Sequence, residues 1–402
     1  MKFNFDKTLD HKANHSYRWE QPEGRDDIIG MGTADMDFEC PPCIREAAQQ
    51  ICSENTFNYR AKTDHYYDSL CSWYDRMYGL NVTRDWLTNI PATLGAIRFL
   101  IGHFAKAGDK IIMQTPHFSP LERAVKAAGC ELILNPLQLI AGRYELDLKD
   151  FEKKIKEYHP SMYILVNPHN PTGRVFTRDE LEKMVEICHE NNVLVLSDEV
   201  HCLITYENHK HIPLLALSDM SREIGIQVMA MSKGFNTMSL PHAVIMIADP
   251  SMQKSWTDYI LPFDFYYASN SYAISAFTAI TDGLGDEWLS EVTDYLNDNL
   301  QLFLFEIKKR NMPIRPIRPE AGYLLWIDCR GERLDPEGNY PGLHSEHLAE
   351  DFLELAGISL ADGLEFGEAG RGFVRMNFAV TRDTLMTVIE RLDTMFCQMR
   401  NG

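Results

Sequence analysis

Three polar clusters in the sequence each follow directly on an apolar run. One is the amide-rich stretch Asn-Pro-His-Asn-Pro-Thr-Gly at residues 167–173. The second is a carboxylate pair, Asp198 and Glu199, and the third is Ser232 with Lys233. In a layered α/β protein, functional groups gather just past the carboxyl ends of the strands. The sequence therefore predicts that the three clusters meet at one edge of a sheet.

An amide, a carboxylate and a lysine at one sheet edge suit the cofactor pyridoxal phosphate (PLP). A lysine bonds covalently to this cofactor, a carboxylate keeps its ring nitrogen protonated, and an amide donates to the ring oxygen. Each residue type also has a simpler interpretation. A lysine after a strand is usually a solvated cation, an aspartate there is often a helix N-cap, and Asn-Pro-x-Asn-Pro is often a turn. The joint placement of the three clusters is what favours the cofactor.

The segment between about residues 85 and 250 alternates short apolar runs with longer amphipathic ones. This pattern predicts a layered α/β domain with a mainly parallel sheet. Residues 164–166 and 193–196 are apolar at consecutive positions, which is typical of strands covered on both faces. A helix is expected over residues 179–190, where apolar residues recur at helical spacing. The predicted strands are residues 86–90, 110–114, 131–135, 162–166, 193–197, 227–231 and 243–247.

A second, smaller α+β domain is predicted from the change of pattern after residue 251. Long helical stretches come first, mixed short segments follow, and an amphipathic helix covers residues 382–399. We expect residues 46–275 to form the large domain, and residues 1–45 with 276–402 to form the small one. With no Gly, Ser or Pro-rich linker, the two domains should be apposed with a cleft between them.

Length and charge exclude several classes of protein. A chain of 402 residues suggests two or three domains. The formal charge of −19 argues against nucleic acid as a partner. No stretch has the layout of a signal peptide or the length of an apolar membrane span, so we expect a cytoplasmic protein with no membrane partner.

The nine cysteines do not have the pattern of a disulfide framework, and we interpret them as mostly buried thiols. Cys40-Pro-Pro-Cys43 suggests a redox or zinc site. However, no second Cys pair or His pair lies at a ligand spacing, so no metal is predicted.

The three clusters closely resemble the signatures of fold-type I PLP enzymes of the class I/II aminotransferase superfamily. The segments that carry this likeness are residues 167–173, 197–199 and 232–236. Within the superfamily the chain resembles the MalY/PatB branch, which contains cystathionine β-lyases and cystalysin-like C-S lyases. This narrower likeness rests on residues 34–38, 198–201, 328–330, 365–367 and 372–377. The resemblance implies a fold-type I α/β architecture with PLP as cofactor.

The resemblance also implies a role for each residue around the ring. Lys233 is the expected cofactor-bonding lysine and the base that removes the substrate Cα proton. Asp198 would pair with the ring nitrogen. Asn170 would hydrogen-bond the ring oxygen with support from His201, and it is also an expected substrate contact. Arg375 resembles the arginine that binds the substrate carboxylate, for which a planar guanidinium is well suited. A surface ion pair is the simpler interpretation of Arg375.

The other expected cofactor contacts come from separate parts of the chain. Ala92 and Thr93, at the start of an apolar helix, are the candidates for the phosphate, since backbone N–H groups at a helix start bind anions. Ser232 is also expected to bind the cofactor. Phe118 stands where the family usually has a tyrosine stacked on the cofactor ring. Tyr59 resembles a tyrosine that reaches the phosphate from a neighbouring subunit, which implies a homodimer with a shared active site. Core packing beside Tyr66 and Tyr67 is the alternative for Tyr59.

The function that the resemblance implies is β-elimination from L-cystathionine, L-cysteine or other S-substituted cysteines, to give a thiol, pyruvate and ammonia. An aminotransferase is the first alternative, because the same residues can serve amino-group transfer. A regulatory binding protein that keeps the fold is the second.

Overall fold

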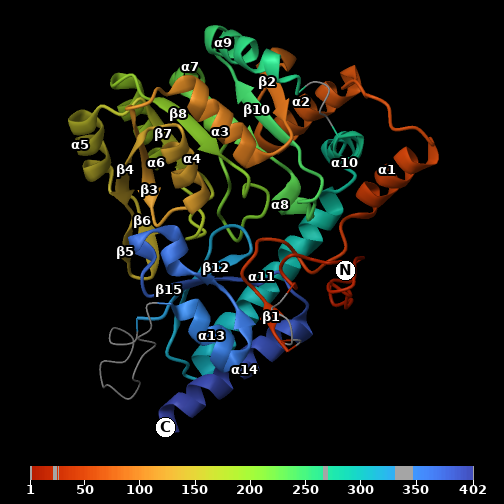
Figure 1. Ribbon diagram of the computed structural model, residues 1–402, viewed down its shortest axis with the longest axis vertical. Helices are drawn as coiled ribbons and strands as arrows, with labels where there is room; N and C mark the ends of the chain where they lie inside the picture. The colour runs from red at the N-terminus through yellow and green to blue at the C-terminus, as the bar shows by residue number, and fades with distance from the viewer. Residues whose placement is uncertain (1, 21–24, 26, 266–269, 331–346, 402) are drawn as a thin grey trace.

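The computed structural model describes residues 2–20, 25, 27–265, 270–330 and 347–401, and its centre is a seven-stranded sheet (Figure 1). Six strands point the same way, and β10 runs antiparallel to both of its neighbours. The strands, in order across the sheet, are β2 (Leu87–Ile90), β10 (Ala243–Ile247), β9 (Gly225–Met229), β8 (Leu194–Asp198), β7 (Met162–Val166), β3 (Lys110–Thr115) and β4 (Glu131–Pro136). The predicted seven-stranded, mainly parallel sheet is confirmed.

The predicted strands match the observed ones closely, with one clear shift. The strand expected over residues 227–231 is β9, which ends two residues earlier, at Met229. Ala230 and Met231 therefore belong to the connection that leads into the short helix α8 (Ser232–Phe235), which carries Lys233. Ser232 and Lys233 consequently lie two residues farther past the end of the strand than the sequence pattern predicts.

Helices cover both faces of the sheet, which explains why its inner strands are apolar at consecutive positions. Along β7, Ile164 and Val166 pack in one core with α3 (Thr93–Phe104), α4 (Ser119–Ala127) and α9 (Pro250–Ile260). The alternate residues Tyr163 and Leu165 pack in the opposite core with α5 (Leu148–Tyr158) and α6 (Arg178–Glu190). Since successive side chains of a strand point to opposite faces, a doubly covered strand needs an apolar residue at every position.

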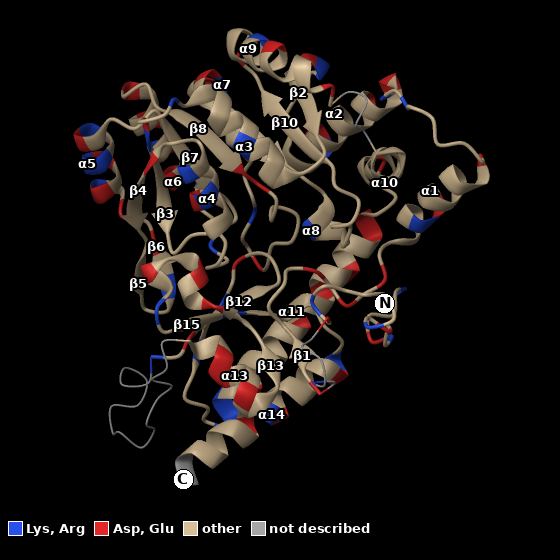
Figure 2. Ribbon diagram, in the orientation of Figure 1, with Lys and Arg blue, Asp and Glu red and all other residues tan. Residues whose placement is uncertain are grey.

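The surface helix α5 shows how charge is kept at the outside of these layers. Phe151 and Ile155 are buried against the sheet, while Lys156 pairs with Glu152 on the exposed side. In Figure 2 the ribbon of α5 carries blue and red segments, whereas the inner strands are mostly tan. The helix thus follows the one-sided apolar pattern of a helix that packs on a core.

A four-stranded sheet lies below the first one in Figure 1. Its strands, in order, are β11 (Arg315–Ile317), β12 (Leu324–Asp328), β15 (Phe373–Asn377) and β14 (Ala361–Asp362), and every pairing is antiparallel. Around it lie the helices α11 (Asp286–Lys309), α13 (Leu348–Ala356) and α14 (Arg382–Asn401). The α+β character expected after residue 251 is present in this part of the chain.

The amino-terminal segment packs onto this second sheet region. Strand β1 (Ile29–Gly30) pairs in parallel with β13 (Ile358–Ser359). The helices α1 (Pro42–Ser53), α2 (Asp64–Tyr78) and α10 (Ser271–Thr281) lie on the right-hand side in Figure 1, on the β2 and β10 side of the large sheet. The expected border at residue 275 falls inside α10, and the two-domain division stays a prediction.

The remaining regular elements are small. A hairpin of β5 (Gln138–Ile140) and β6 (Arg143–Glu145) follows β4, and α7 (Asp219–Ile224) precedes β9. Within the described ranges, no helix combines the length and the apolar character needed to cross a membrane.

Candidate active site

A cavity of about 560 Å³ opens at the carboxyl ends of β7 and β8. Nine of the ten residues predicted from sequence to form the site line this cavity, from both sheet regions. These nine are Ala92, Thr93, Phe118, Asn170, Asp198, His201, Ser232, Lys233 and Arg375. The structure therefore brings together the three clusters with the distant arginine, while the role of each residue toward a cofactor stays a prediction.

Asp198 is the last residue of β8, and its carboxylate is buried. The Val200 N–H donates to its Oδ1 atom at 3.2 Å, and no cation of the described residues forms an ion pair with it. Burial, together with the neighbouring Glu199 charge, raises the pKa of Asp198 to about 6, while the Val200 N–H and the Lys233 charge act in the opposite direction. A buried carboxylate without a cationic partner is costly, so this site is ready for a cation.

Lys233 stands on α8, next to the same strand ends. Its Nζ atom donates to the Ala34 carbonyl oxygen at 2.6 Å. Burial lowers the pKa of Lys233 to about 8, and the nearby Arg375 charge lowers it too, while Asp35 and Asp198 act in the opposite direction. An amine with a pKa near neutrality serves both as nucleophile and as base.

The segment at residues 34–38 holds this lysine in place. The Ala34 carbonyl accepts from the Tyr323 hydroxyl at 3.2 Å in addition to Lys233. Asn236, at the end of α8, accepts from Met36 N–H at 3.0 Å and donates to the Met36 carbonyl at 3.0 Å. Asn236 has a φ of 55°, a left-handed conformation that Asn tolerates well. These contacts explain in structural terms why residues 34–38 are part of the pattern that the chain shares with the MalY/PatB branch.

Arg375 comes from β15 of the four-stranded sheet and is only 7% exposed. Its guanidinium donates to Asn170 Oδ1 at 3.0 Å and to the Gly32 carbonyl at 2.9 Å, and it lies 4.8 Å from the Phe366 ring centre. Among the residues that the structure describes, no carboxylate forms an ion pair with it. The interpretation of Arg375 as a surface ion pair is therefore wrong, and a buried guanidinium is available for a carboxylate ligand.

The contact between Asn170 and Arg375 also orients the amide. Because Oδ1 of Asn170 accepts from the arginine, its Nδ2 group remains as the donor. Both residues line the cavity, and the contact of this donor with a ring oxygen stays a prediction. We call Lys233, Asp198, Asn170 and Arg375 the charged side of the cavity.

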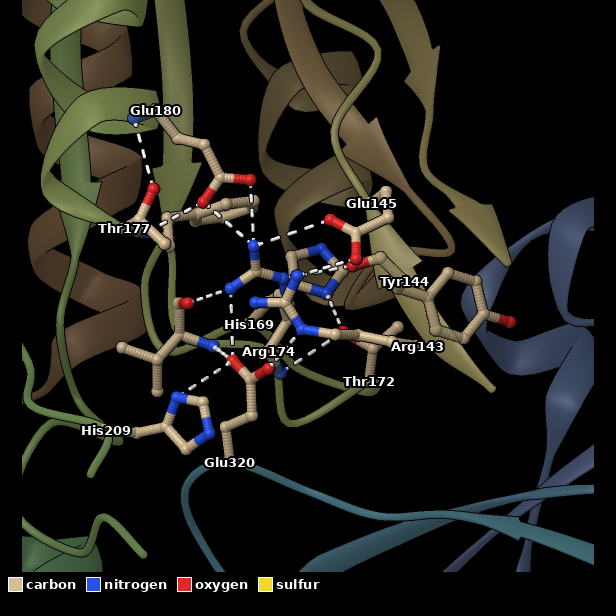
Figure 3. A network of polar contacts seen from close by, with 12 residues as sticks. Arg143, Tyr144, Glu145, His169, Thr172, Arg174, Thr177, Glu180, His209 and Glu320 are labelled. Carbon is tan, nitrogen blue, oxygen red and sulfur yellow. Dashed lines mark hydrogen bonds and ion pairs between the residues drawn. The ribbon is translucent and has the colours of Figure 1, made fainter. Parts of the chain in front are cut away.

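A buried ionic network anchors the loop that carries Asn170 (Figure 3). Arg174, directly after this loop, pairs with Glu180 at 2.8 Å and with Glu320 at 3.0 Å. Glu320 also pairs with Arg143 at 2.6 Å, and its backbone N–H donates to the Gly173 carbonyl at 2.9 Å. Removing one partner would leave a buried charge, which costs roughly 3–5 kcal/mol. The network thus joins α6, the β5–β6 hairpin and the segment before β12 around the Asn170 loop.

His201 and Phe118 complete the walls next to the charged side. Burial, together with the Lys233 and Arg375 charges, lowers the pKa of His201 to about 3, so its ring is neutral at pH 7. Phe118 is the N-cap residue of α4 and presents an aromatic ring without a hydroxyl. A neutral imidazole and a phenyl ring suit contact with a flat heterocycle.

Another part of the wall is the start of α3, where Ala92 is the N-cap and Thr93 the first helical residue. No side chain caps this end, and the first intrahelical bond runs from Ala96 N–H to the Ala92 carbonyl at 2.8 Å. The N–H groups of the first turn are thus available to an anion, and the helix dipole favours negative charge there. We call Ala92, Thr93, Ser232 and His242 the α3 side of the cavity.

Tyr59 lies outside the cavity and is 81% exposed, so the core-packing alternative is wrong. Its expected role toward a neighbouring subunit stays a prediction.

His242 lines the cavity, although the sequence analysis did not identify it. It precedes β10, and only the reversed direction of that strand brings its start to the catalytic edge.

The cysteines are free thiols, and five of the nine are buried. Burial raises the pKa of both Cys40 and Cys43, which lowers their thiolate content. In the part of the chain that the structure describes, no three His, Cys, Asp or Glu side chains are grouped so that they could hold a metal ion.

The residues present fit PLP in three independent ways. A buried carboxylate with no cationic partner among the described residues suits the ring nitrogen. A lysine of lowered pKa suits the aldehyde carbon, and a helix start whose N-cap residue makes no side-chain capping bond suits the phosphate. Together with the seven-stranded α/β sheet, this arrangement defines the class of the protein. It is a PLP-dependent enzyme of the aminotransferase fold.

The chain belongs to the aminotransferase class I and II family, whose model matches residues 26–392. It is 29% identical to cystathionine β-lyase PatB of Bacillus subtilis, over 97% of this chain and 98% of that protein. A PLP-bound C-S lyase from Staphylococcus hominis shares 27% identity with a TM-score of 0.89, covering 98% of each chain. A PLP-bound protein from Clostridium difficile 630 with a provisional aminotransferase name shares 32% identity with a TM-score of 0.90, covering 98% of this chain and all of that one.

Proposed function

We propose that the protein is a PLP-dependent C-S β-lyase that converts L-cystathionine, L-cysteine or another S-substituted cysteine to a thiol, pyruvate and ammonia. The observation that carries the proposal is the buried Arg375 guanidinium, which has no carboxylate partner among the described residues and shares a cavity with Lys233 and Asp198. This combination suits an amino acid whose Cα lies beside the lysine. The similarity to PatB and to the staphylococcal C-S lyase supports the lyase assignment.

When bound, PLP supplies an electron sink for the charge that develops at the substrate Cα. Asp198 holds a proton at the ring nitrogen, because its buried carboxylate is stabilised by a cationic partner. Asn170 donates through Nδ2 to the ring oxygen, and His201 stays a neutral neighbour on the same wall. These groups maintain the charge state of the site.

Arg375 and Lys233 handle the substrate itself. Arg375 binds the α-carboxylate through two parallel hydrogen bonds, which fixes the Cα–H bond relative to Lys233. The Lys233 amine removes the Cα proton, for which a pKa of about 8 is well matched to neutral solution. The thiolate then leaves from Cβ, and hydrolysis of the remaining three-carbon unit gives pyruvate and ammonia.

We also propose a homodimer in which Tyr59 completes the active site of the partner. Phe57, Tyr59 and Leu261 are each more than two thirds exposed, and Phe263 is partly exposed. Exposed aromatic and aliphatic side chains of this size are typical of protein interfaces. The molecular mass in solution tests this part of the proposal.

The lyase proposal is tested by incubating the PLP-loaded protein with L-cystathionine and measuring pyruvate and free thiol. We expect equal amounts of both, with no need for a keto acid. Product formation only when a keto acid is added, with a new amino acid as product, would contradict the lyase. That outcome would instead support an aminotransferase, which the 32% identity to the clostridial protein favours as the second candidate.

A further inference from the structure

Two buried side chains, Tyr66 and His242, and the half-buried Asn89 form a short hydrogen-bond relay beside the cavity. Asn89 Nδ2 lies 2.8 Å from the Tyr66 hydroxyl oxygen, and that oxygen lies 2.8 Å from Nε2 of His242. Asn89 Nδ2 also donates to the Ala243 carbonyl oxygen at 3.5 Å, as expected if this atom is the amide nitrogen. The relay therefore runs from Asn89 through Tyr66 to His242.

The direction of the relay fixes the tautomer of His242. An amide nitrogen only donates, and Asn89 Nδ2 lies within hydrogen-bond distance of both the Tyr66 oxygen and, at 3.4 Å, His242 Nε2. This arrangement favours an accepting Nε2 with the Tyr66 proton directed to it. Burial, with a contribution from the charge of Lys62, lowers the pKa of His242 to about 3, so the ring is neutral. A neutral imidazole that accepts at Nε2 carries its proton on Nδ1.

The position of His242 places this ring beside the start of α3. Ala243 pairs with Ile90 across β10 and β2, so His242 lies opposite the residue that precedes Ala92. His242 is 9% exposed and lines the main cavity, and with Ser232 it also lines a small adjoining void. Its ring is held at 4.7 Å from the Phe277 ring. Within the described residues, the hydrogen bonds of its side chain all involve Nε2.

We propose that the Nδ1–H group of His242 donates a hydrogen bond to the phosphate of PLP, together with the uncapped first turn of α3. The relay gives the proposal its physical basis, because it removes the alternative tautomer before the ligand arrives. A donor that is already oriented loses little entropy on binding. The Lys62 charge near the same ring adds a favourable field for a phosphate dianion.

The test compares two isosteric substitutions in the full-length apoprotein. His242→Gln keeps a polar atom at the Nε2 position for Tyr66 and removes the Nδ1 donor, whereas His242→Asn keeps a donor at the Nδ1 position. Each protein is titrated with PLP and, separately, with pyridoxal, which lacks the phosphate. We expect His242→Gln to raise the Kd for PLP about tenfold and to leave the Kd for pyridoxal unchanged. His242→Asn should stay within about threefold of the wild type for both ligands.

Two results would overturn the proposal. One is an unchanged Kd for PLP in His242→Gln. The other is an equal loss for PLP and pyridoxal, which would assign His242 a structural role only. Because this test measures binding, its outcome is independent of whether the enzyme acts as a lyase or an aminotransferase.

A measurement on the wild-type protein covers the case in which the variants do not fold. In protein labelled with 15N histidine, one ring with the proton on Nδ1 should change its Nδ1 chemical shift on addition of PLP. The same signal should not respond to pyridoxal. If no histidine signal distinguishes PLP from pyridoxal, His242 does not contact the phosphate.

Discussion

On the charged side of the cavity three of the four binding groups are ionisable side chains, whereas on the α3 side the binding groups are backbone N–H groups and neutral side chains. Asp198 and Arg375 are buried and Lys233 is half-buried, and desolvation shifts the pKa of each toward its neutral form. The start of α3 carries no net charge of its own and attracts anions through its dipole. The two sides therefore perform different tasks: one controls protons and substrate charge, and the other retains the cofactor.

This difference predicts distinct signatures for substitutions on the two sides. Changes on the charged side should lower the rate of the chemical step or the binding of substrate. Changes on the α3 side should weaken PLP binding and leave turnover at saturating PLP almost intact. Substitutions on the charged side and on the α3 side together test whether the two sides perform different tasks.

The largest effect is expected for Lys233→Ala, which removes the base and the cofactor-bonding amine. We predict a loss of at least about 10³-fold in the rate of pyruvate formation from L-cystathionine. Lys254→Ala is the matched control, because Lys254 pairs with Asp258 on the exposed side of α9. A Lys233→Ala variant with more than a tenth of wild-type activity would show that another group removes the proton.

Asp198→Asn should have the next largest effect. The amide is isosteric but cannot balance a proton on the ring nitrogen, so we expect a loss of about 10²-fold in kcat. Asp258→Asn serves as the surface control. If kcat at saturating substrate stays at the wild-type level, the carboxylate does not support the charge of the ring.

Arg375→Lys should lower kcat/KM about 10- to 100-fold, because a lysine cannot form the two parallel hydrogen bonds of a guanidinium. The exposed Arg371, which pairs with Glu368, provides the control variant Arg371→Lys. For a substrate analogue with an amide in place of the α-carboxylate, the difference between wild type and variant should disappear. A loss of the same size with this analogue would exclude carboxylate binding as the role of Arg375.

The rate at which the apoprotein takes up PLP covalently should rise about tenfold per pH unit below pH 8 and level off above it. The reason is that the Lys233 pKa is lowered to about 8, and only the neutral amine, present above that pKa, attacks the cofactor. The appearance of the absorbance of the bound cofactor after mixing follows this step. A midpoint near 10 would show that burial does not depress the pKa of this lysine.

The smallest effect is expected for Thr93→Ala on the α3 side. Loss of one neutral hydroxyl should raise the Kd for PLP about threefold to tenfold, with kcat at saturating PLP unchanged. Thr257, exposed on α9, offers a control in Thr257→Ala. A drop in kcat without a change in PLP affinity would contradict the division of tasks between the two sides.

The sequence allowed the seven strands and most of the charged side to be predicted, because both depend on local signals. Consecutive apolar residues mark doubly covered strands, as along β7, and polar residues past the strand ends mark the catalytic edge. Arg375 lies far from these clusters in the chain, and only its resemblance to a known pattern connected it to them.

The remaining features depend on tertiary structure. His242 reaches the cavity because β10 runs against its neighbours, and a strand's direction is not visible in its own residues. The pairing of Arg174 with Glu320 joins residues 146 positions apart, which no local pattern reports. The end of β9 was misplaced because Ala230 and Met231 continue its apolar run.

The central claim is that Lys233 is the amine that holds PLP at this cavity. The most direct test is to load the protein with PLP, reduce it with borohydride and locate the pyridoxyl group by peptide mass spectrometry. We predict a single modified residue, Lys233. A pyridoxyl group on Lys62 or on any other lysine instead, or no modification at all, would contradict the proposed site.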